Sequence, residues 1–305
     1  MATLGLGMAA LGRPGYMSLG HAGDLPSVAM DAMSRHAQAV LEAAYQAGVR
    51  HVDAARSYGR GEQFVRDWLD RRPHPDVVVS SKWGYRYAAR WEATAPVHEV
   101  KDHSLPHLVA QYPESRTVLG ERLKVYQIHS VTPESPVLED GAVLDELARL
   151  RDRDGVELGL SVTGPRQAEV VLKALPLERG GRRLFDWVQA TWNLLEPSAG
   201  PALAEAKARG LKVIVKEPLA NGRLTVRGDV TAFQALATAR GVSPDALALA
   251  SVLAQPWADV VLLGATTLEQ LESNLKARET APVEPGTLVQ APAAYWAYRA
   301  KLPWT

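Results

Sequence analysis

The sequence contains no cysteine. Disulfide bonds, thiolate metal sites and cysteine nucleophiles are therefore excluded, and we predict no metal site. The lack of cysteine fits a reducing compartment, so we expect the protein to be cytoplasmic. Lys+Arg and Asp+Glu both number 34, which makes the formal net charge zero. This balance gives no indication of nucleic acid or an anionic membrane as a partner.

Long hydrophobic runs are also missing. No stretch approaches the ~20 unbroken apolar residues of a membrane span, and we expect no membrane partner. Residues 1–20 are apolar but interrupted by glycine, and no basic residue precedes their apolar part. They fit a buried first strand better than a signal peptide.

Short apolar runs alternate with longer amphipathic ones along the chain, which indicates parallel strands joined by helices. With 305 residues and 47% hydrophobic content, the chain can bury a large core. We predict a single (β/α)₈ TIM-barrel domain spanning residues 1–305. The eight predicted strands are Leu4–Met8, Val49–Asp53, Val77–Ser81, Val125–His129, Glu157–Ser161, Trp187–Ala190, Val213–Lys216 and Val260–Leu263.

Helices are predicted between these strands, at Ala37–Gln46, Ala142–Arg151, Gln167–Leu175 and Ala246–Leu253. The alternative architecture is an open doubly wound sheet. Such a sheet usually carries G-x-G-x-x-G after its first strand. Residues 5–10 begin with Gly5-Leu6-Gly7 but lack the third glycine, which favours the barrel.

Two segments of the chain are not needed to build a minimal eight-stranded barrel. Residues 84–104 form a long, aromatic-rich insertion after the third strand, and residues 280–305 form a tail in which we expect a helix. Long loops at the carboxyl ends of barrel strands commonly build binding sites. We therefore predict a substrate pocket with aromatic walls, formed first by Trp83 and Tyr85 and extended by Tyr87, Trp91 and Trp296.

Three predicted strands end in residues that can do acid–base chemistry. Asp53 and Tyr58 follow the second strand, Lys82 the third, and His129 the fourth. Since the carboxyl ends of barrel strands meet on one face, these four side chains are expected to converge. An ammonium beside a phenol favours the phenolate and lowers the tyrosine pKa from about 10.

The chemistry implied is protonation of an oxygen that gains electrons, as in carbonyl reduction. Asp53 could keep Lys82 charged, and His129 could hold the carbonyl oxygen or relay a proton. No side chain donates a hydride, so a nicotinamide cofactor is required.

These motifs resemble those of the aldo-keto reductases. The resemblance rests on Asp53 with Tyr58-Gly59, Lys82 and Tyr126-Gln127-Ile128-His129. It continues in five later motifs, namely Gly159-Leu160-Ser161, Gln189 with Asn193-Leu194-Leu195, Pro218-Leu219 with Gly222-Arg223-Leu224, Gly264-Ala265-Thr266, and Gln270-Leu271 with Asn274.

The resemblance implies an NADP(H)-dependent reductase that converts an aldehyde or ketone to an alcohol on a (β/α)₈ barrel. Tyr58 would be the general acid, Lys82 and Asp53 would tune it, and His129 would orient the substrate carbonyl. Ser161 and Gln189 would bind the nicotinamide carboxamide. The full set of predicted cofactor-binding residues is Ser161, Gln189, Lys216, Pro218, Leu219, Arg223, Gly264, Thr266, Gln270 and Asn274.

The chain departs from the family pattern at three places. Val162 stands where many members have asparagine, so one amide hydrogen bond to nicotinamide is expected to be lost. Lys216-Glu217 replaces an aromatic residue and serine, and Lys216 could pair with Glu217 or reach a phosphate. No Lys or Arg lies within residues 264–274 to bind a 2′-phosphate. The candidate substitutes are Arg223, Arg227, Lys276 and Arg278.

Two other functions remain open at this point. The first is a non-catalytic or weakly catalytic NADP(H)-binding barrel that acts as a redox sensor or as a subunit of an assembly. The second is a Schiff-base lyase that uses Lys82 or Lys216 as a desolvated nucleophile. The sequence specifies neither the carbonyl substrate nor the oligomeric state.

Overall fold

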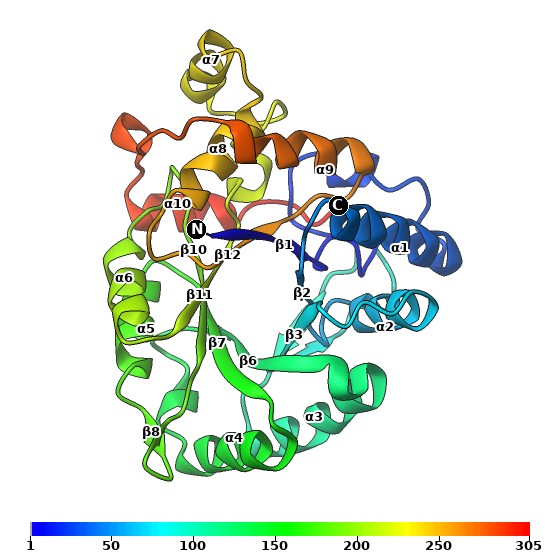
Figure 1. Cartoon of the computed structure of the whole chain (residues 1–305), viewed down its shortest axis with the longest axis vertical. Coiled ribbons are helices and arrows are strands. Elements are labelled where there is room, and N and C mark those ends of the chain that lie inside the picture. The colour runs from blue at the N-terminus through cyan, green and yellow to red at the C-terminus, as the bar shows by residue number, and fades with distance from the viewer. Residues whose placement is uncertain (1) are drawn as a thin grey trace.

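The computed structural model describes residues 2–305, so Met1 of the predicted domain lies outside the described residues. Eight parallel strands close into a barrel in the order β1-β12-β11-β10-β7-β6-β3-β2. Figure 1 shows the ring of strands with the helices outside it. The barrel strands are β1 (Thr3–Gly7), β2 (His51–Asp53), β3 (Val78–Trp83), β6 (Leu123–Val131), β7 (Glu157–Val162), β10 (Trp187–Thr191), β11 (Lys212–Lys216) and β12 (Val260–Leu263).

The helices form the outer layer, and α7 lies outermost, beyond α8 (Figure 1). Local signals set several of their ends. The Asp140 side chain accepts hydrogen bonds from the backbone N–H groups of Ala142 and Val143 and so caps α4, which ends at Gly155 in the left-handed conformation. The helices are α1 (Met30–Gln46), α2 (Gly61–Arg71), α3 (Leu105–Leu119), α4 (Gly141–Asp154), α5 (Gln167–Ala174), α6 (Gly200–Ala208), α7 (Thr231–Ala239), α8 (Pro244–Leu253), α9 (Leu268–Leu275) and α10 (Pro292–Arg299).

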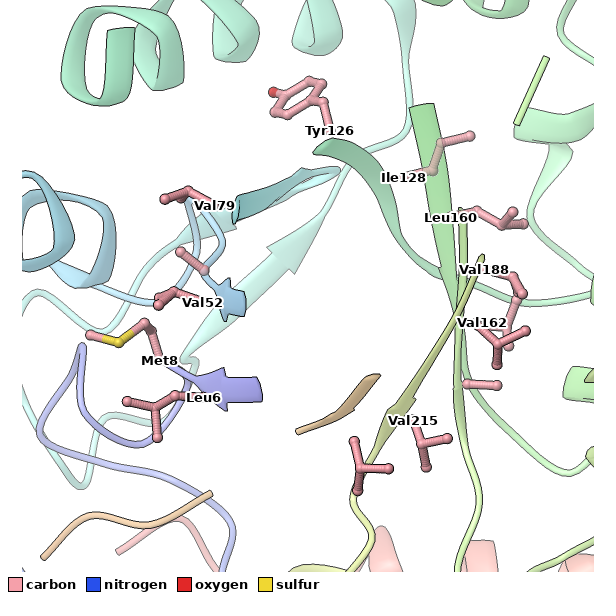
Figure 2. Packing of buried hydrophobic residues seen from close by; sticks show 14 of the residues in the cluster. Leu6, Met8, Val52, Val79, Tyr126, Ile128, Leu160, Val162, Val188 and Val215 are labelled. Atoms are coloured by element: carbon pink, nitrogen blue, oxygen red, sulfur yellow. The ribbon is translucent and has the colours of Figure 1, made fainter. Parts of the chain in front are cut away.

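Side chains alternate between the two faces of each strand, which separates two cores. In Figure 2, residues such as Leu6, Val52, Val79, Leu160 and Val188 point away from the barrel axis, toward the helices. A second, smaller cluster contains Val125, Trp187, Ile214, Val260 and Leu262, which occupy the alternate positions of their strands. This inner cluster leaves the carboxyl ends of the strands for polar residues.

The predicted strands agree closely with the structure. All eight exist, and β12 has the predicted bounds. The largest differences lie in the helices: α1 begins at Met30 instead of Ala37, because Met33 is also buried against the core. At its amino end β2 begins at His51 instead of Val49, since pairing with β1 starts at His51.

Both additional segments, the insertion after β3 and the tail, contain secondary structure. Residues 84–104 contain the antiparallel hairpin of β4 (Tyr85–Tyr87) and β5 (Glu99–Lys101). A second hairpin, β8 (Glu178–Arg179) with β9 (Arg182–Arg183), was not predicted. The expected tail helix is α10, whose Tyr295 and Trp296 are buried in a further apolar cluster. No helix in the described part of the chain is long and apolar enough to cross a membrane.

The tail returns to the beginning of the barrel. The backbone N–H of Tyr16 donates to the carbonyl of Thr305 over 3.1 Å, and the N–H of Thr305 donates back over 3.3 Å. Trp304 stacks on His98, with ring centroids 4.1 Å apart. The tail therefore joins the loop after β1 and the insertion after β3.

Candidate active site

A cavity of about 420 Å³ lies at the carboxyl ends of the barrel strands. Asp53, Tyr58 and His129 line it, and Lys82 lies buried beside them with 1% of its surface exposed. The four predicted catalytic residues are therefore brought together at the end of the barrel where function is expected. Among residues 2–305, no cluster of His, Asp or Glu is arranged to hold a metal ion.

The phenol oxygen of Tyr58 occupies the centre of this group. It lies 3.3 Å from Nζ of Lys82 and 3.4 Å from Nε2 of His129. Lys82 also forms an ion pair with Asp53 and donates to the carbonyl of Ala54 over 3.0 Å. Three contacts thus link the four predicted residues in one chain, from Asp53 through Lys82 and Tyr58 to His129.

The local fold explains this convergence. Asp53 ends β2, Lys82 lies near the end of β3, and His129 lies near the end of β6, each at an inward position of its strand. Tyr58 comes from the loop after β2, which turns at Gly59 with φ of 60°. A Cβ atom at Gly59 would lie 2.6 Å from the carbonyl oxygen of Gly12, so only glycine fits this approach of two loops.

Asp53 is held from three further strands. Its Oδ1 accepts hydrogen bonds from Ser80 at 2.7 Å, Gln189 at 3.1 Å and Gln127 at 3.2 Å. A buried carboxylate is costly unless it is paired and hydrogen-bonded, and here both conditions are met. The charge of Lys82 is consequently fixed in place and largely neutralised.

The electrostatics correct one prediction. Lys82 was expected to lower the pKa of Tyr58, but burial first, and then the charges of Asp53 and Glu99, raise that pKa well above 10. The physical reason is that burial disfavours the charged phenolate and that Asp53 offsets the charge of Lys82. Burial, followed by the charges of Lys82 and Arg13, lowers the pKa of His129 well below 6.5. The site therefore holds a protonated phenol beside a neutral imidazole.

Most of the predicted cofactor-binding residues line the same cavity. A nucleotide would also find buried polar atoms without partners here, because Oδ1 of both Asn221 and Asn274 has no hydrogen bond. These free acceptors and the polar lining of the cavity fit a nucleotide. The predicted residues on the wall are Ser161, Gln189, Lys216, Pro218, Leu219, Gly264, Thr266, Gln270 and Asn274.

Arg223 is not brought to this wall. Its side chain is buried against Asp229, at 2.9 Å, and Gln290, at 3.1 Å, and its guanidinium lies over the ring of Tyr298. These partners fix the charge away from the cavity. Arg227 lines the cavity instead, where it is paired with Asp24 at 2.6 Å.

The predicted aromatic wall also needs correction. Trp83 is fully buried in the outer core, because it follows the inward-facing Lys82 and strand alternation turns it to the opposite face. Tyr85 lines a neighbouring groove, and its ring lies 4.9 Å from the ring of His129. Tyr87, Trp91 and Trp296 do not line the main cavity, where Tyr16 and Trp304 add aromatic rings to that of Tyr58.

Lys216 and Glu217 form a charged group with Arg299 of α10. Arg299 donates to both carboxylate oxygens of Glu217, at 2.9 Å and 3.0 Å from Nε, and Nζ of Lys216 lies 3.7 Å from the same carboxylate. Burial lowers the pKa of Lys216 to about 8. The predicted pairing of Lys216 with Glu217 is present. The bonds from Arg299 to the same carboxylate anchor the tail.

The cavity residues that sequence reasoning missed include four that surround the acid–base group, namely Arg13, Glu99, Arg299 and Trp304. Only Arg13 carried a usable signal, since it lies in a Gly-Arg-Pro-Gly segment soon after a strand that ends at the catalytic face. The others lie in the insertion and the tail, where no periodic pattern assigns a direction to a side chain.

The sequence is similar to those of known proteins. The sequence model of the Aldo/keto reductase family matches residues 3–285. An uncharacterized oxidoreductase of Bacillus subtilis, YqkF, is 26% identical over 297 residues, which cover 83% of this chain and 87% of that protein.

Solved structures show the same fold. The holo form of an aldo-keto reductase from Bacillus halodurans superposes with a TM-score of 0.70 at 20% identity, covering 94% of this chain and 92% of the other. A glycerol dehydrogenase from Gluconobacter oxydans gives a TM-score of 0.67 at 21% identity, covering 90% of this chain and 85% of the other.

Proposed function

The chain belongs to the aldo/keto reductase family, and we propose that it is an NADPH-dependent reductase of aldehydes or ketones. Membership of this family makes the protein an oxidoreductase that works with a nicotinamide cofactor and a small carbonyl substrate. The preference for NADPH, the role of Tyr58 as proton donor and a cytoplasmic location are parts of the proposal.

The observation that carries this proposal is the position of one hydroxyl group. Tyr58 Oη lies between Lys82 Nζ and His129 Nε2, at 3.3 Å and 3.4 Å, on the wall of a deep cavity. A carbonyl oxygen placed against Tyr58 and His129 would meet two polar groups at once. This arrangement suits the delivery of a proton to an oxygen that becomes negatively charged.

A reduced nicotinamide, when bound, supplies the hydride to the carbonyl carbon. Tyr58 delivers its proton to the carbonyl oxygen and becomes a phenolate, which solvent later reprotonates. Neutral His129 donates from Nε2 to the same oxygen and orients it. The fixed Lys82 ammonium lies beside the phenolate oxygen and stabilises its charge.

The residues that would hold the cofactor are those already on the cavity wall. Ser161 Oγ accepts a bond from the N–H of Ser130 at 2.8 Å and keeps its own proton for a further acceptor. The Gln189 amide now donates to Asp53 and retains a second N–H. The side chain of Asn274 donates to Asp245 and leaves its oxygen available.

A panel of aliphatic and aromatic aldehydes and ketones tests the proposal, with NADPH or NADH consumption followed by absorbance. We expect turnover with at least one carbonyl class and a lower KM for NADPH than for NADH. Tyr58→Phe should lower kcat by about 10²–10⁴-fold, because the proton donor is removed. Its affinity for NADPH, measured by fluorescence, should remain near that of the wild type.

Tyr45→Phe is the matched control. Tyr45 bonds to Asp76 at the opposite end of the barrel, so this variant should keep wild-type kcat. A Tyr58→Phe enzyme with wild-type kcat would contradict the assignment of the acid. Tight NADPH binding without turnover across the whole panel would instead favour a redox sensor.

A further inference from the structure

Arg13 lies at the junction of three segments around the catalytic phenol. It belongs to the loop between β1 and α1, lines the cavity and is 2% exposed. Its guanidinium carbon lies 5.0 Å from the centre of the Tyr58 ring, 4.7 Å from that of Trp304 and 5.6 Å from that of Tyr16. A buried cation is therefore surrounded by three aromatic rings.

Hydrogen bonds fix the orientation of this guanidinium. Its Nε donates to the carbonyl of Ala9 at 3.1 Å, and Nη1 donates to the carbonyl of Ser57 at 3.2 Å and to Glu99 at 2.8 Å. Ser57 directly precedes Tyr58, so Arg13 is linked to the backbone that carries the phenol. Glu99 links it to the insertion after β3.

This position matters when Tyr58 loses its proton. The negative charge of a phenolate spreads over its ring, and a cation over an aromatic face is attracted even to a neutral ring. Lys82 lies nearer the oxygen, but Asp53 neutralises it in a buried pair. Arg13 is also paired, yet the side chain of Glu99 is 18% exposed whereas that of Arg13 is 3% exposed. Water therefore reaches the carboxylate more than the guanidinium, although Glu99 still affects the pKa of Tyr58 more than Arg13 does.

We propose that Arg13 is a positioning residue for carbonyl reduction, which holds Tyr58 in place and makes its phenol a stronger acid. The proposal rests on the reductase function given above. Glu99 moderates this effect by its opposite charge. Glu99 of the insertion after β3 and Trp304 of the tail both contact Arg13. Both segments therefore affect the acidity of Tyr58 through this guanidinium.

The charges around Tyr58 support this assignment. Burial raises the pKa of Tyr58, Asp53 and Glu99 raise it further, and Arg13 acts to lower it. Charged and titratable groups around the phenol come from several elements at this end of the barrel: Asp53 on β2, Lys82 on β3, Glu99 on β5, His129 on β6, Lys216 on β11, Glu217 after β11, Arg299 on α10 and Tyr16 in the loop after β1.

The test uses two variants with opposite expected effects on the pH profile of reduction. Arg13→Met should lower kcat by about 30-fold, the equivalent of one desolvated cation–π contact, and should move the alkaline limb of the kcat profile to higher pH. Glu99→Gln should move that limb to lower pH, because the charge that opposes Arg13 is gone. Arg13→Lys should recover part of the lost kcat.

The control pair is Arg50→Met and Asp76→Asn. Arg50 lies over the ring of Tyr45 and pairs with Asp76 at the other end of the barrel. Neither variant should therefore move the pH profile of kcat. A purely structural Arg13 would lower activity without shifting the limb. Shifts of the same sign in Arg13→Met and Glu99→Gln, or no shift in either, would therefore overturn the inference.

A second readout does not depend on turnover. Protein labelled with 3-fluorotyrosine can be titrated by fluorine NMR, with the Tyr58 signal assigned from Tyr58→Phe. We expect the midpoint of that signal to rise in Arg13→Met and to fall in Glu99→Gln. If the wild type reduced no carbonyl compound, the proposed function would fail, while this titration would still decide what Arg13 does to Tyr58.

Discussion

Both ends of the barrel join an arginine, a tyrosine and a carboxylate. At the amino ends of the strands, Arg50 lies 4.0 Å from the centre of the Tyr45 ring and 2.6 Å from Asp76. At the carboxyl ends, Arg13 lies over Tyr58 and pairs with Glu99 at 2.8 Å. The two groups consist of the same three residue types, but solvent reaches them to different extents.

That difference decides what the groups can do. The side chains of Arg50 and Asp76 are 42% and 52% exposed, so solvent screens their charges. Arg13 is almost inaccessible, and Tyr58 shares a cavity wall with it. A charge near a buried phenol changes its acidity, whereas the same charge in water changes little. Burial, more than residue type, distinguishes the catalytic end of this barrel.

The largest expected contrast between the two ends concerns two lysines. Lys82→Met leaves Asp53 buried without its cation and should lower the free energy of unfolding by about 3–5 kcal/mol. Lys212 lies 3.2 Å from Glu157 but is half exposed, so Lys212→Met should cost about 0–1 kcal/mol. Urea unfolding curves measure both changes. Equal losses in the two variants would refute the role given to burial.

A smaller contrast should appear on acidification. Burial acts to raise the pKa of Glu217, but Arg299 and Lys216 outweigh it and hold that pKa at about 2, below its ordinary value of 4.5. A depressed carboxyl pKa stabilises the fold above pH 4.5, and this contribution is lost as the pH falls toward 2. The contribution is roughly 3 kcal/mol.

Glu217→Gln should therefore be less stable than the wild type at neutral pH and should lose less stability on acidification below about pH 4.5. Thermal melts across this pH range measure the effect. Asp76→Asn at the exposed end is the matched control and should leave the slope close to that of the wild type. Parallel slopes for Glu217→Gln and the wild type would show that the pair with Arg299 is not closed in solution.

The smallest contrast concerns two glycines with positive φ. Gly59→Ala should cost about 1–3 kcal/mol and lower kcat, because the new Cβ meets the Gly12 carbonyl and displaces the loop of Tyr58. Gly48, with φ of 86°, has its nearest atom 3.9 Å away, so Gly48→Ala should cost about 1 kcal/mol and leave kcat unchanged. Stability and steady-state kinetics of the two variants test this difference.

The sequence predicted the barrel from the alternation of short apolar runs with longer amphipathic ones. It predicted the meeting of Asp53, Lys82 and His129 because the carboxyl ends of barrel strands share one face. Strand alternation places Trp83 on the opposite face from Lys82, so its burial was also predictable. The acidity of Tyr58 could not be predicted, since it depends on how completely Asp53 cancels the charge of Lys82. Arg13 and Trp304 come from distant irregular segments, whose packing no local pattern specifies.

The backbone pairing of Tyr16 with Thr305 has a consequence for the order of assembly. The last barrel strand, β12, ends at Leu263, whereas Trp304, one wall of the cavity, lies in the tail. Closure of the barrel therefore needs no residue of the tail, but enclosure of Arg13 does. Docking of the tail is thus the step that shields the acid–base group from water.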